Sequence, residues 1–219
     1  MRVVIAGGHG KIALRLERAL AARGDDPVGL IRDPGHEQDL RDTGAQPVLC
    51  DLETSGVEEV AEHLRGADAV VFAAGAGPGS GVARKDTVDR AASVLLADAA
   101  ERAGVPRFVQ ISSMGAGDPP QAGADDVWAA YIRAKTDAED DLRARDLGWT
   151  ILRPGSLTDD PGTGLVTLAE PRVPRGKVPR DDVAAVIVAL LDTPGSVGRT
   201  VELVAGDTPV EEAVEAIAS

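Results

Sequence analysis

Aromatic residues are nearly missing from this 219-residue chain, since Phe, Trp and Tyr make up only 2% of it. The core must therefore be filled by Val, Ile, Leu and Ala. Hydrophobic residues amount to 43% of the chain, which excludes wholesale disorder. Small aliphatic side chains of this kind suit helices that pack closely on a parallel sheet.

Cysteine and long apolar runs are also scarce. The single cysteine, Cys50, excludes an internal disulfide, and we interpret it as a small buried hydrophobic residue rather than a nucleophile. No apolar run reaches the ~20 residues that span a bilayer. Because no secretory signal precedes the first apolar segment, we expect a cytoplasmic protein.

Basic residues are fewer than acidic ones, 23 against 36, and the formal net charge is -13. Such a charge repels phosphate backbones and anionic membranes, so we expect a small-molecule partner and neither nucleic acid nor membrane. A nucleotide phosphate would have to be bound by backbone N–H groups and a few placed cations. The three histidines, His9, His36 and His63, are scattered, and we predict no metal site.

Strand-like apolar runs alternate with helix-like segments along the whole chain. Strands are predicted at residues 2–6, 27–31, 47–50, 69–73, 107–112, 149–152 and 200–204. Helices are predicted at residues 11–23, 57–65, 85–103, 127–147, 181–191 and 209–218. Six strands are preceded by a glycine that could end a helix in the left-handed conformation: Gly24, Gly44, Gly66, Gly104, Gly148 and Gly198.

This alternation predicts an α/β protein with a doubly wound parallel sheet, the Rossmann fold, over a single domain of residues 1–219. Two stretches rich in proline, glycine or small residues interrupt the rhythm, at 115–126 and 153–180. Both follow strand ends, on the side of the sheet where ligands bind. We interpret residues 153–180 as a small substrate-side loop region.

The segment V-V-I-A-G-G-H-G-K-I-A reads as a strand, a glycine turn and a helix start. It fits the dinucleotide pattern, in which glycines allow a tight turn and a close approach of pyrophosphate to a helix N-terminus. The alternative is a plain glycine-rich turn. The expected cofactor contacts are Gly7, Gly8, His9, Gly10, Lys11 and Ile12.

The tip of the second predicted strand carries Arg32, followed by Asp33. An arginine there accommodates the 2′-phosphate of NADP, whereas an acidic residue bonds the 2′-hydroxyl of NAD. Because Arg32 comes first, we predict NADP, with NAD as the alternative. Further cofactor contacts are expected where the third and fourth strands end: Asp51, Leu52, Ala73, Ala74 and Gly75.

Tyr131 and Lys135 stand four residues apart on a predicted helix and therefore share one face. A nearby ammonium favours the phenolate form of a tyrosine, so Tyr131 could exchange a proton with a substrate oxygen. Lys135 would also bond the nicotinamide ribose. Ser113 or Ser112 could hold the substrate oxygen. The alternative is a half-buried tyrosine with a solvated lysine.

Seven motifs are spread along nearly the whole chain, from residue 3 to residue 186: V-V-I-A-G-G-H-G-K-I, V-G-L-I-R-D, A-D-A-V-V-F-A-A-G, G-V-P-R-F-V-Q-I-S-S, Y-I-R-A-K, W-T-I-L-R-P-G and D-D-V-A-A-V. In this order they resemble the short-chain dehydrogenase/reductase superfamily, and more closely its atypical NAD(P)H-binding branch, related to epimerase/dehydratases. The resemblance implies cofactor contacts by the glycine loop, Arg32, Tyr131, Lys135 and Arg153-Pro154-Gly155. It implies Ser113 or Ser112 as the third catalytic group.

Three functions remain open at this point. The first is an oxidoreductase that transfers hydride between NADP(H) and a small carbonyl, quinone or flavin-like substrate. The second is a non-catalytic NAD(P)-binding regulator that senses redox state, and the third a nucleotide-sugar epimerase or dehydratase. The region after Leu152 is small for a sugar-nucleotide site. We expect a monomer or a homodimer.

Overall fold

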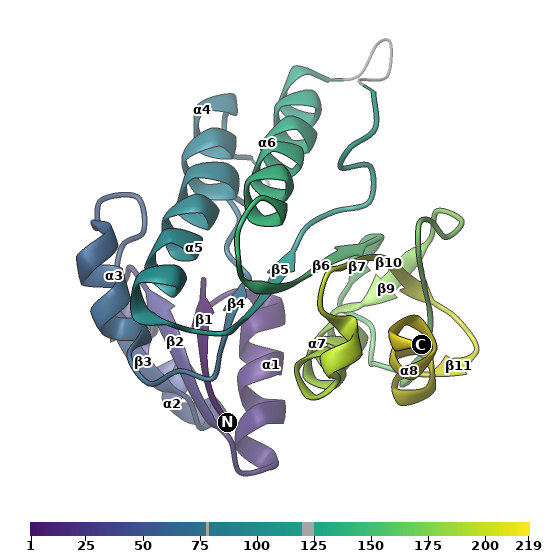
Figure 1. Cartoon of the computed structure of the whole chain (residues 1–219), viewed down its shortest axis with the longest axis horizontal. Helices are drawn as coiled ribbons and strands as arrows, with labels where there is room; N and C mark the ends of the chain where they lie inside the picture. The colour runs from purple at the N-terminus through teal and green to yellow at the C-terminus, as the bar shows by residue number, and fades with distance from the viewer. Residues whose placement is uncertain (78, 120–124) are drawn as a thin grey trace.

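The computed structural model describes residues 1–77, 79–119 and 125–219. Nine strands of these residues form the main sheet, in the order β11-β8-β10-β6-β5-β4-β1-β2-β3 (Figure 1). They are β1 (Arg2–Ala6), β2 (Asp26–Ile31), β3 (Gln46–Leu49), β4 (Ala69–Phe72), β5 (Arg107–Ile111), β6 (Gly148–Pro154), β8 (Leu165–Ala169), β10 (Arg199–Ala205) and β11 (Thr208–Pro209). Two further strands, β7 (Ser156–Thr158) and β9 (Lys177–Pro179), form a separate parallel pair.

Helices cover both faces of this sheet (Figure 1). They are α1 (Lys11–Ala22), α2 (Glu37–Thr43), α3 (Val57–Leu64), α4 (Val82–Arg84), α5 (Ala92–Ala103), α6 (Asp126–Arg143), α7 (Arg180–Asp192) and α8 (Val210–Ala218). Short 3-10 turns lie at Pro34–His36 and Pro194–Ser196. Within the described residues, no helix is long and apolar enough to cross a membrane.

The strand pairing confirms the predicted doubly wound sheet. From β3 to β10 all neighbouring strands are parallel, and only β8 runs antiparallel to its neighbours β10 and β11. The chain winds outward from β1 in both directions, with β2 on one side and β4 on the other. The switch in winding at β1 leaves a crevice at the carboxyl ends of these strands, where ligands bind in such sheets.

Alternation along the strands builds two cores, one on each face of the sheet. In β1, Val3 and Ile5 pack with α1, α7 and α8, whereas Val4 and Ala6 pack with α3 and α5. Each face is filled mainly by Val, Leu, Ile and Ala, as the near-absence of aromatic residues requires. This two-sided burial explains why the strands are continuous apolar runs rather than alternating ones.

Five of the six predicted helix-ending glycines take a positive φ: Gly24, Gly44, Gly66, Gly104 and Gly198. Gly148 does not, so the prediction is wrong there. It is the first residue of β6, and a Cβ at this position would lie 2.7 Å from the carbonyl oxygen of Pro106. The close approach of two backbone segments, not a left-handed turn, therefore requires glycine at 148.

The segment 153–180 is more ordered than a loop. It contains β7, β8 and β9, and β8 extends the main sheet beside β10. Val166 and Leu168 are buried while their neighbours Leu165 and Thr167 are exposed, which is the alternation of a strand with one covered face. The helix α2 was also not predicted, because Leu40 is the only large apolar side chain in its seven residues.

The helix predicted at 85–103 has an irregular first half. Residues 85–91, between α4 and α5, form a π-helical segment that buries Lys85, Val88 and Asp89. Such segments are rare and widen the helix locally. The buried lysine and aspartate contact the segment that follows β4, through the carbonyl of Gly77 and the N–H of Ala76.

Candidate cofactor and active site

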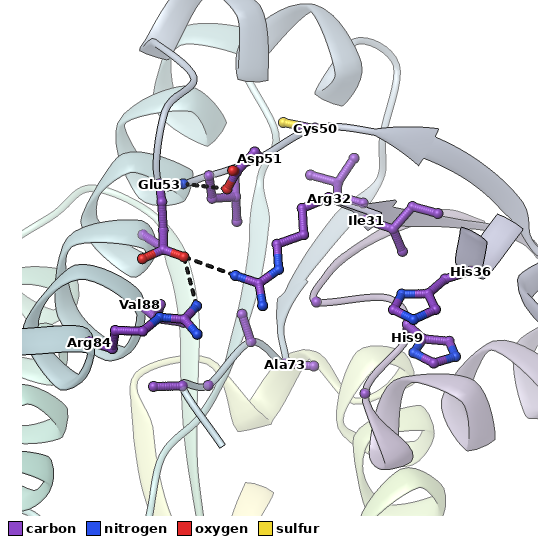
Figure 2. Close-up of a pocket in the computed structure, with 18 residues that line it drawn as sticks. His9, Ile31, Arg32, His36, Cys50, Asp51, Glu53, Ala73, Arg84 and Val88 are labelled. Atoms are coloured by element: carbon purple, nitrogen blue, oxygen red, sulfur yellow. Dashed lines mark hydrogen bonds and ion pairs between the residues drawn. The ribbon is translucent and has the colours of Figure 1, made fainter. Parts of the chain in front are cut away.

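A pocket of about 250 Å³ opens at the carboxyl ends of β1, β2 and β4 (Figure 2). The pocket brings together most of the residues predicted to contact a cofactor: Gly7, His9, Gly10, Arg32, Asp51, Leu52, Ala73, Ala74 and Gly75. The position is the crevice that the change of winding direction creates. A dinucleotide that crosses this crevice would have its pyrophosphate beside the start of α1.

The N-terminus of α1 is suited to a phosphate. Gly10 caps the helix without a side-chain hydrogen bond, and no acidic residue stands in the first turn. By contrast α2, α3, α6, α7 and α8 all carry acidic residues in their first turns. In this acidic protein, the helix that begins at the pocket therefore keeps its free N–H groups and the positive end of its dipole for an anion.

The loop glycines are required by the packing of strands as well as by space for a ligand. Gly7 has a φ of +80°, and a Cβ there would lie 2.7 Å from Ala74 Cα. A Cβ on Gly8 would lie 2.8 Å from Gly29 Cα, and the Gly8 N–H donates to Leu30. Gly8 therefore faces β2 and lies outside the pocket lining.

Other residues predicted to contact the cofactor also lie outside the pocket lining: Lys11, Ile12, Lys135, Pro154 and Gly155. Lys11 Nζ donates to Asp159 at 2.5 Å, and Ile12 packs against the core. The Pro154 carbonyl accepts from Met114, and the Gly155 N–H donates to Leu203. Lys11, Ile12, Pro154 and Gly155 therefore make their contacts within the protein, where α1 and β6 pack against neighbouring strands and loops.

A cluster of charge at the tips of β2 and β3 was not predicted. Glu53 Oε2 lies 3.1 Å from Arg32 Nη1 and 2.7 Å from Arg84 Nη2 (Figure 2). Glu53 Oε1 accepts from Thr87 at 2.8 Å. Arg32, Glu53 and Arg84 all line the pocket. No local sequence pattern signals this cluster, because its members come from three separate segments.

Two histidines stack at the edge of the pocket. The rings of His9 and His36 are 3.5 Å apart at an interplanar angle of 7° (Figure 2). His9 Nε2 lies 2.7 Å from Asp39 Oδ2. His36, which the sequence did not single out, lines the pocket with His9. The stack connects the glycine loop to the turn after β2.

Cys50 also lines the pocket, although it is buried. Burial raises the pKa of its thiol, and the hydrogen bond to Ser55 only partly opposes this effect. A thiol with a raised pKa is a poor nucleophile. This agrees with our interpretation of Cys50 as a small apolar residue.

Tyr131 is half-buried on α6, and two ammonium groups lie over its ring. Lys135 Nζ lies 5.7 Å from the centre of the Tyr131 ring, and Lys85 Nζ lies 5.2 Å from it. Lys135 is buried and pairs with Asp89, whereas Lys85 donates to the carbonyl of Gly77 at 3.0 Å. The structure thus brings Tyr131 and Lys135 together and adds Lys85, which spacing along one helix could not reveal.

The two candidate serines have different surroundings. Ser112 Oγ donates to the buried carboxylate of Glu139 at 2.5 Å. That carboxylate also accepts from Arg143 and takes two hydrogen bonds from Arg153. Among the residues that the structure describes, Ser113 Oγ makes a single contact, at 3.3 Å, with the carbonyl of Met114. Ser112 and Arg153 therefore belong to a buried network, and of the two serines Ser113 has the weaker contacts among these residues.

Comparisons with known proteins agree with this geometry. Residues 7–194 match the NAD(P)H-binding family. A Bacillus subtilis protein, named an uncharacterized sugar epimerase, is 35% identical over 216 residues, which cover 98% of this chain and 99% of that protein.

Solved structures share the whole fold. One from Bacillus halodurans, provisionally named an NAD-dependent epimerase/dehydratase, is 35% identical with a TM-score of 0.90 and covers 99% of both chains. An anaerobilin reductase from Escherichia coli O157:H7 is 27% identical with a TM-score of 0.80, over 94% of this chain and 98% of that one. The chain thus belongs to the NAD(P)H-binding family, as its resemblance to that branch implied.

Proposed function

We propose that the protein is an NADP(H)-dependent reductase that acts on a small carbonyl, quinone or flavin-like substrate. The observation that carries this proposal is that the centre of the Tyr131 ring, on the helix that follows β5, lies 5.2 Å from Lys85 Nζ and 5.7 Å from Lys135 Nζ. The pocket at the start of α1 supports a dinucleotide, and Arg32 at its lining supports NADP. The relative named as a reductase supports the reaction class.

When bound, the nicotinamide supplies the hydride. The residues of this chain would supply the rest: Ser113 would donate a hydrogen bond that holds the substrate oxygen. Tyr131 would give its proton to that oxygen as hydride reaches the carbon, so that a carbonyl becomes an alcohol. Lys85 and Lys135 would stabilise the phenolate that remains.

Two other functions keep specific support. The commitment of Lys135 to Asp89 and to the carbonyl of Ile111 would suit a purely structural lysine in a non-catalytic NAD(P)-binding regulator. The name of the Bacillus subtilis relative supports a sugar epimerase. Both alternatives retain the same pocket and differ in the role of Tyr131.

The test compares the natural protein with Tyr131→Phe. Oxidation of NADPH is followed with carbonyl, quinone, flavin and linear tetrapyrrole substrates. For the epimerase alternative, a nucleotide sugar is incubated with the protein and its products are separated by chromatography, because epimerisation consumes no NADPH overall. We expect turnover of at least one of the first four classes, and a loss of about 100-fold in kcat in Tyr131→Phe. The affinity for NADPH should change less than about twofold.

Trp128→Phe is the matched control, because it alters the aromatic neighbour of Tyr131 without removing a hydroxyl. Turnover that survives in Tyr131→Phe would remove this residue from the mechanism. Tight NADPH binding with no consumption over the whole panel and no conversion of the nucleotide sugar would favour the regulator.

A further inference from the structure

The charged cluster at the pocket consists of Arg32, Glu53 and Arg84, and comes from three parts of the chain. Arg32 follows β2, Glu53 lies in the turn after β3, and Arg84 ends α4. Both guanidinium groups contact the same oxygen, Glu53 Oε2, at 3.1 Å and 2.7 Å. The other oxygen of Glu53 is held by Thr87, and the Glu53 N–H donates to Asp51 at 3.0 Å.

Most of the donors in this cluster are not used internally. Each guanidinium has five N–H donors, yet within the described residues Arg32 and Arg84 each make a single side-chain hydrogen bond, to Glu53. Their side chains are 57% and 40% exposed and line the pocket. Two arginines with free donors match the terminal oxygens of a phosphate monoester.

The carboxylate between them is ionised at neutral pH. Burial by itself would raise the pKa of the Glu53 carboxyl, but hydrogen bonds from Thr87 and Arg84, with the charges of Arg84 and Arg32, bring it below its usual range. A dianionic phosphate that binds both arginines must therefore come close to a negative charge. Repulsion between the two would weaken binding of the phosphate.

We propose that Arg84 is the second cation of a 2′-phosphate subsite, and that Glu53 is an internal competitor which the phosphate displaces from both arginines. This deepens the proposed use of NADP and rests on it. Without ligand, Glu53 holds the two guanidinium groups together at the mouth of the pocket. With a 2′-phosphate bound, the same groups face the ligand. Glu53 thus lowers the preference for NADP below what two arginines alone would give.

The test uses adenosine 2′,5′-bisphosphate and 5′-AMP, which differ only in the 2′-phosphate. The preference is the ratio of their dissociation constants, measured by calorimetry. In the natural protein the bisphosphate should bind tighter. Arg84→Met should reduce the preference about tenfold, and Glu53→Gln should increase it about tenfold. Glu58→Gln breaks a surface pair with Arg102 on another helix and serves as the matched control, with no change.

Each part of the proposal is tested by a different result. A preference that falls or stays constant in Glu53→Gln would overturn the competitor role, and an unchanged preference in Arg84→Met would overturn the second cation. Equal affinities in the natural protein would overturn the subsite itself. Neither probe carries a nicotinamide, so these results do not depend on turnover. Failure of the reductase proposal would appear only in the Tyr131→Phe experiment.

Discussion

Lys135 and Asp89 form an ion pair in the interior, with 3.3 Å between Nζ and Oδ1 and side chains that are 4% and 1% exposed. The same ammonium donates to the carbonyl of Ile111 at the end of β5. The other oxygen of Asp89 accepts from the N–H of Ala76, in the segment after β4. The charge of the candidate catalytic lysine is therefore matched by a carboxylate of the π-helical segment, which ties α6 to one wall of the pocket.

Breaking this pair should destabilise the fold. Asp89→Asn leaves a buried ammonium without a counter-ion, and we expect a loss of about 3 kcal/mol in the free energy of unfolding. Lys135→Met should cost a similar amount, and the double variant should lose less than the two single losses together. Urea unfolding measures all three. The exposed pair Arg90–Asp86 is the control, worth less than about 1 kcal/mol, and additive losses at Lys135 and Asp89 would contradict the coupling.

Glu17 predicts a dependence of stability on pH. It is fully buried on α1 behind Gly8 and Gly29, and its Oε1 has no hydrogen-bond partner among the described residues. Burial raises the pKa of its carboxyl from 4.5 to about 8, with the hydrogen bond from Thr43 as an opposing influence. At neutral pH the folded protein therefore keeps a proton that the unfolded chain has released.

Because the unfolded state binds fewer protons across this window, stability should fall as pH rises from about 4.5 to about 8 and level off above that. Glu17→Gln, which stays neutral, should remove this part of the slope and stabilise the protein by about 2–3 kcal/mol at pH 7. Thermal unfolding between pH 5 and pH 9 measures this dependence of stability on pH. Glu211→Gln, at an exposed position, is the control. An unchanged slope in Glu17→Gln would mean that Glu17 is ionised in the fold.

Alanine substitutions at Ser113 and Ser112 should affect different properties, the first turnover and the second stability. Ser113→Ala should lower kcat/KM by about tenfold while the unfolding free energy changes by less than about 0.5 kcal/mol. Ser112→Ala should instead cost about 1–2 kcal/mol, because the buried Glu139 loses a hydrogen-bond donor. Steady-state kinetics measures kcat/KM, and urea unfolding measures the free energy of unfolding, for both variants. The reverse assignment of effects would place Ser112 at the substrate.

Arg107 should matter for stability alone. Burial lowers the pKa of its guanidinium to about 10, and it bonds the carbonyls of Gly148 and Leu190 and the hydroxyls of Thr150 and Ser196. Arg107→Lys cannot satisfy this set of acceptors and should cost about 2 kcal/mol. NADPH affinity should stay the same. A loss of affinity without a loss of stability would show that the residue acts on the pocket.

The winding of the fold could be predicted from local pattern. Continuous apolar runs such as 2–6 and helix-ending glycines such as Gly44 repeat along the chain, and each is set by its own neighbours in sequence. The position of the pocket could be predicted from the same local pattern, because the pocket lies where β1 ends and α1 begins. By contrast β8 joins the sheet through pairing with β10, whose residues lie more than thirty positions away.

The charge cluster at the pocket could not be predicted in the same way. Glu53 and Arg84 are 31 residues apart and meet because β3 and α4 flank the same pocket, not because of any spacing. Lys85 and Tyr131 come from separate segments and meet because the π-helical segment packs against α6. Sequence pattern reveals which strand tips carry charge, whereas the pairing of those charges depends on tertiary structure.

Titration of the unmodified protein with NADPH and NADH in parallel measures whether this pocket takes NADP(H). Because Arg32 and Arg84 line the pocket beside Glu53, we expect one molecule of NADPH per chain, bound about tenfold tighter than NADH. Equal affinities for the two nucleotides, or no binding of either, would contradict the account.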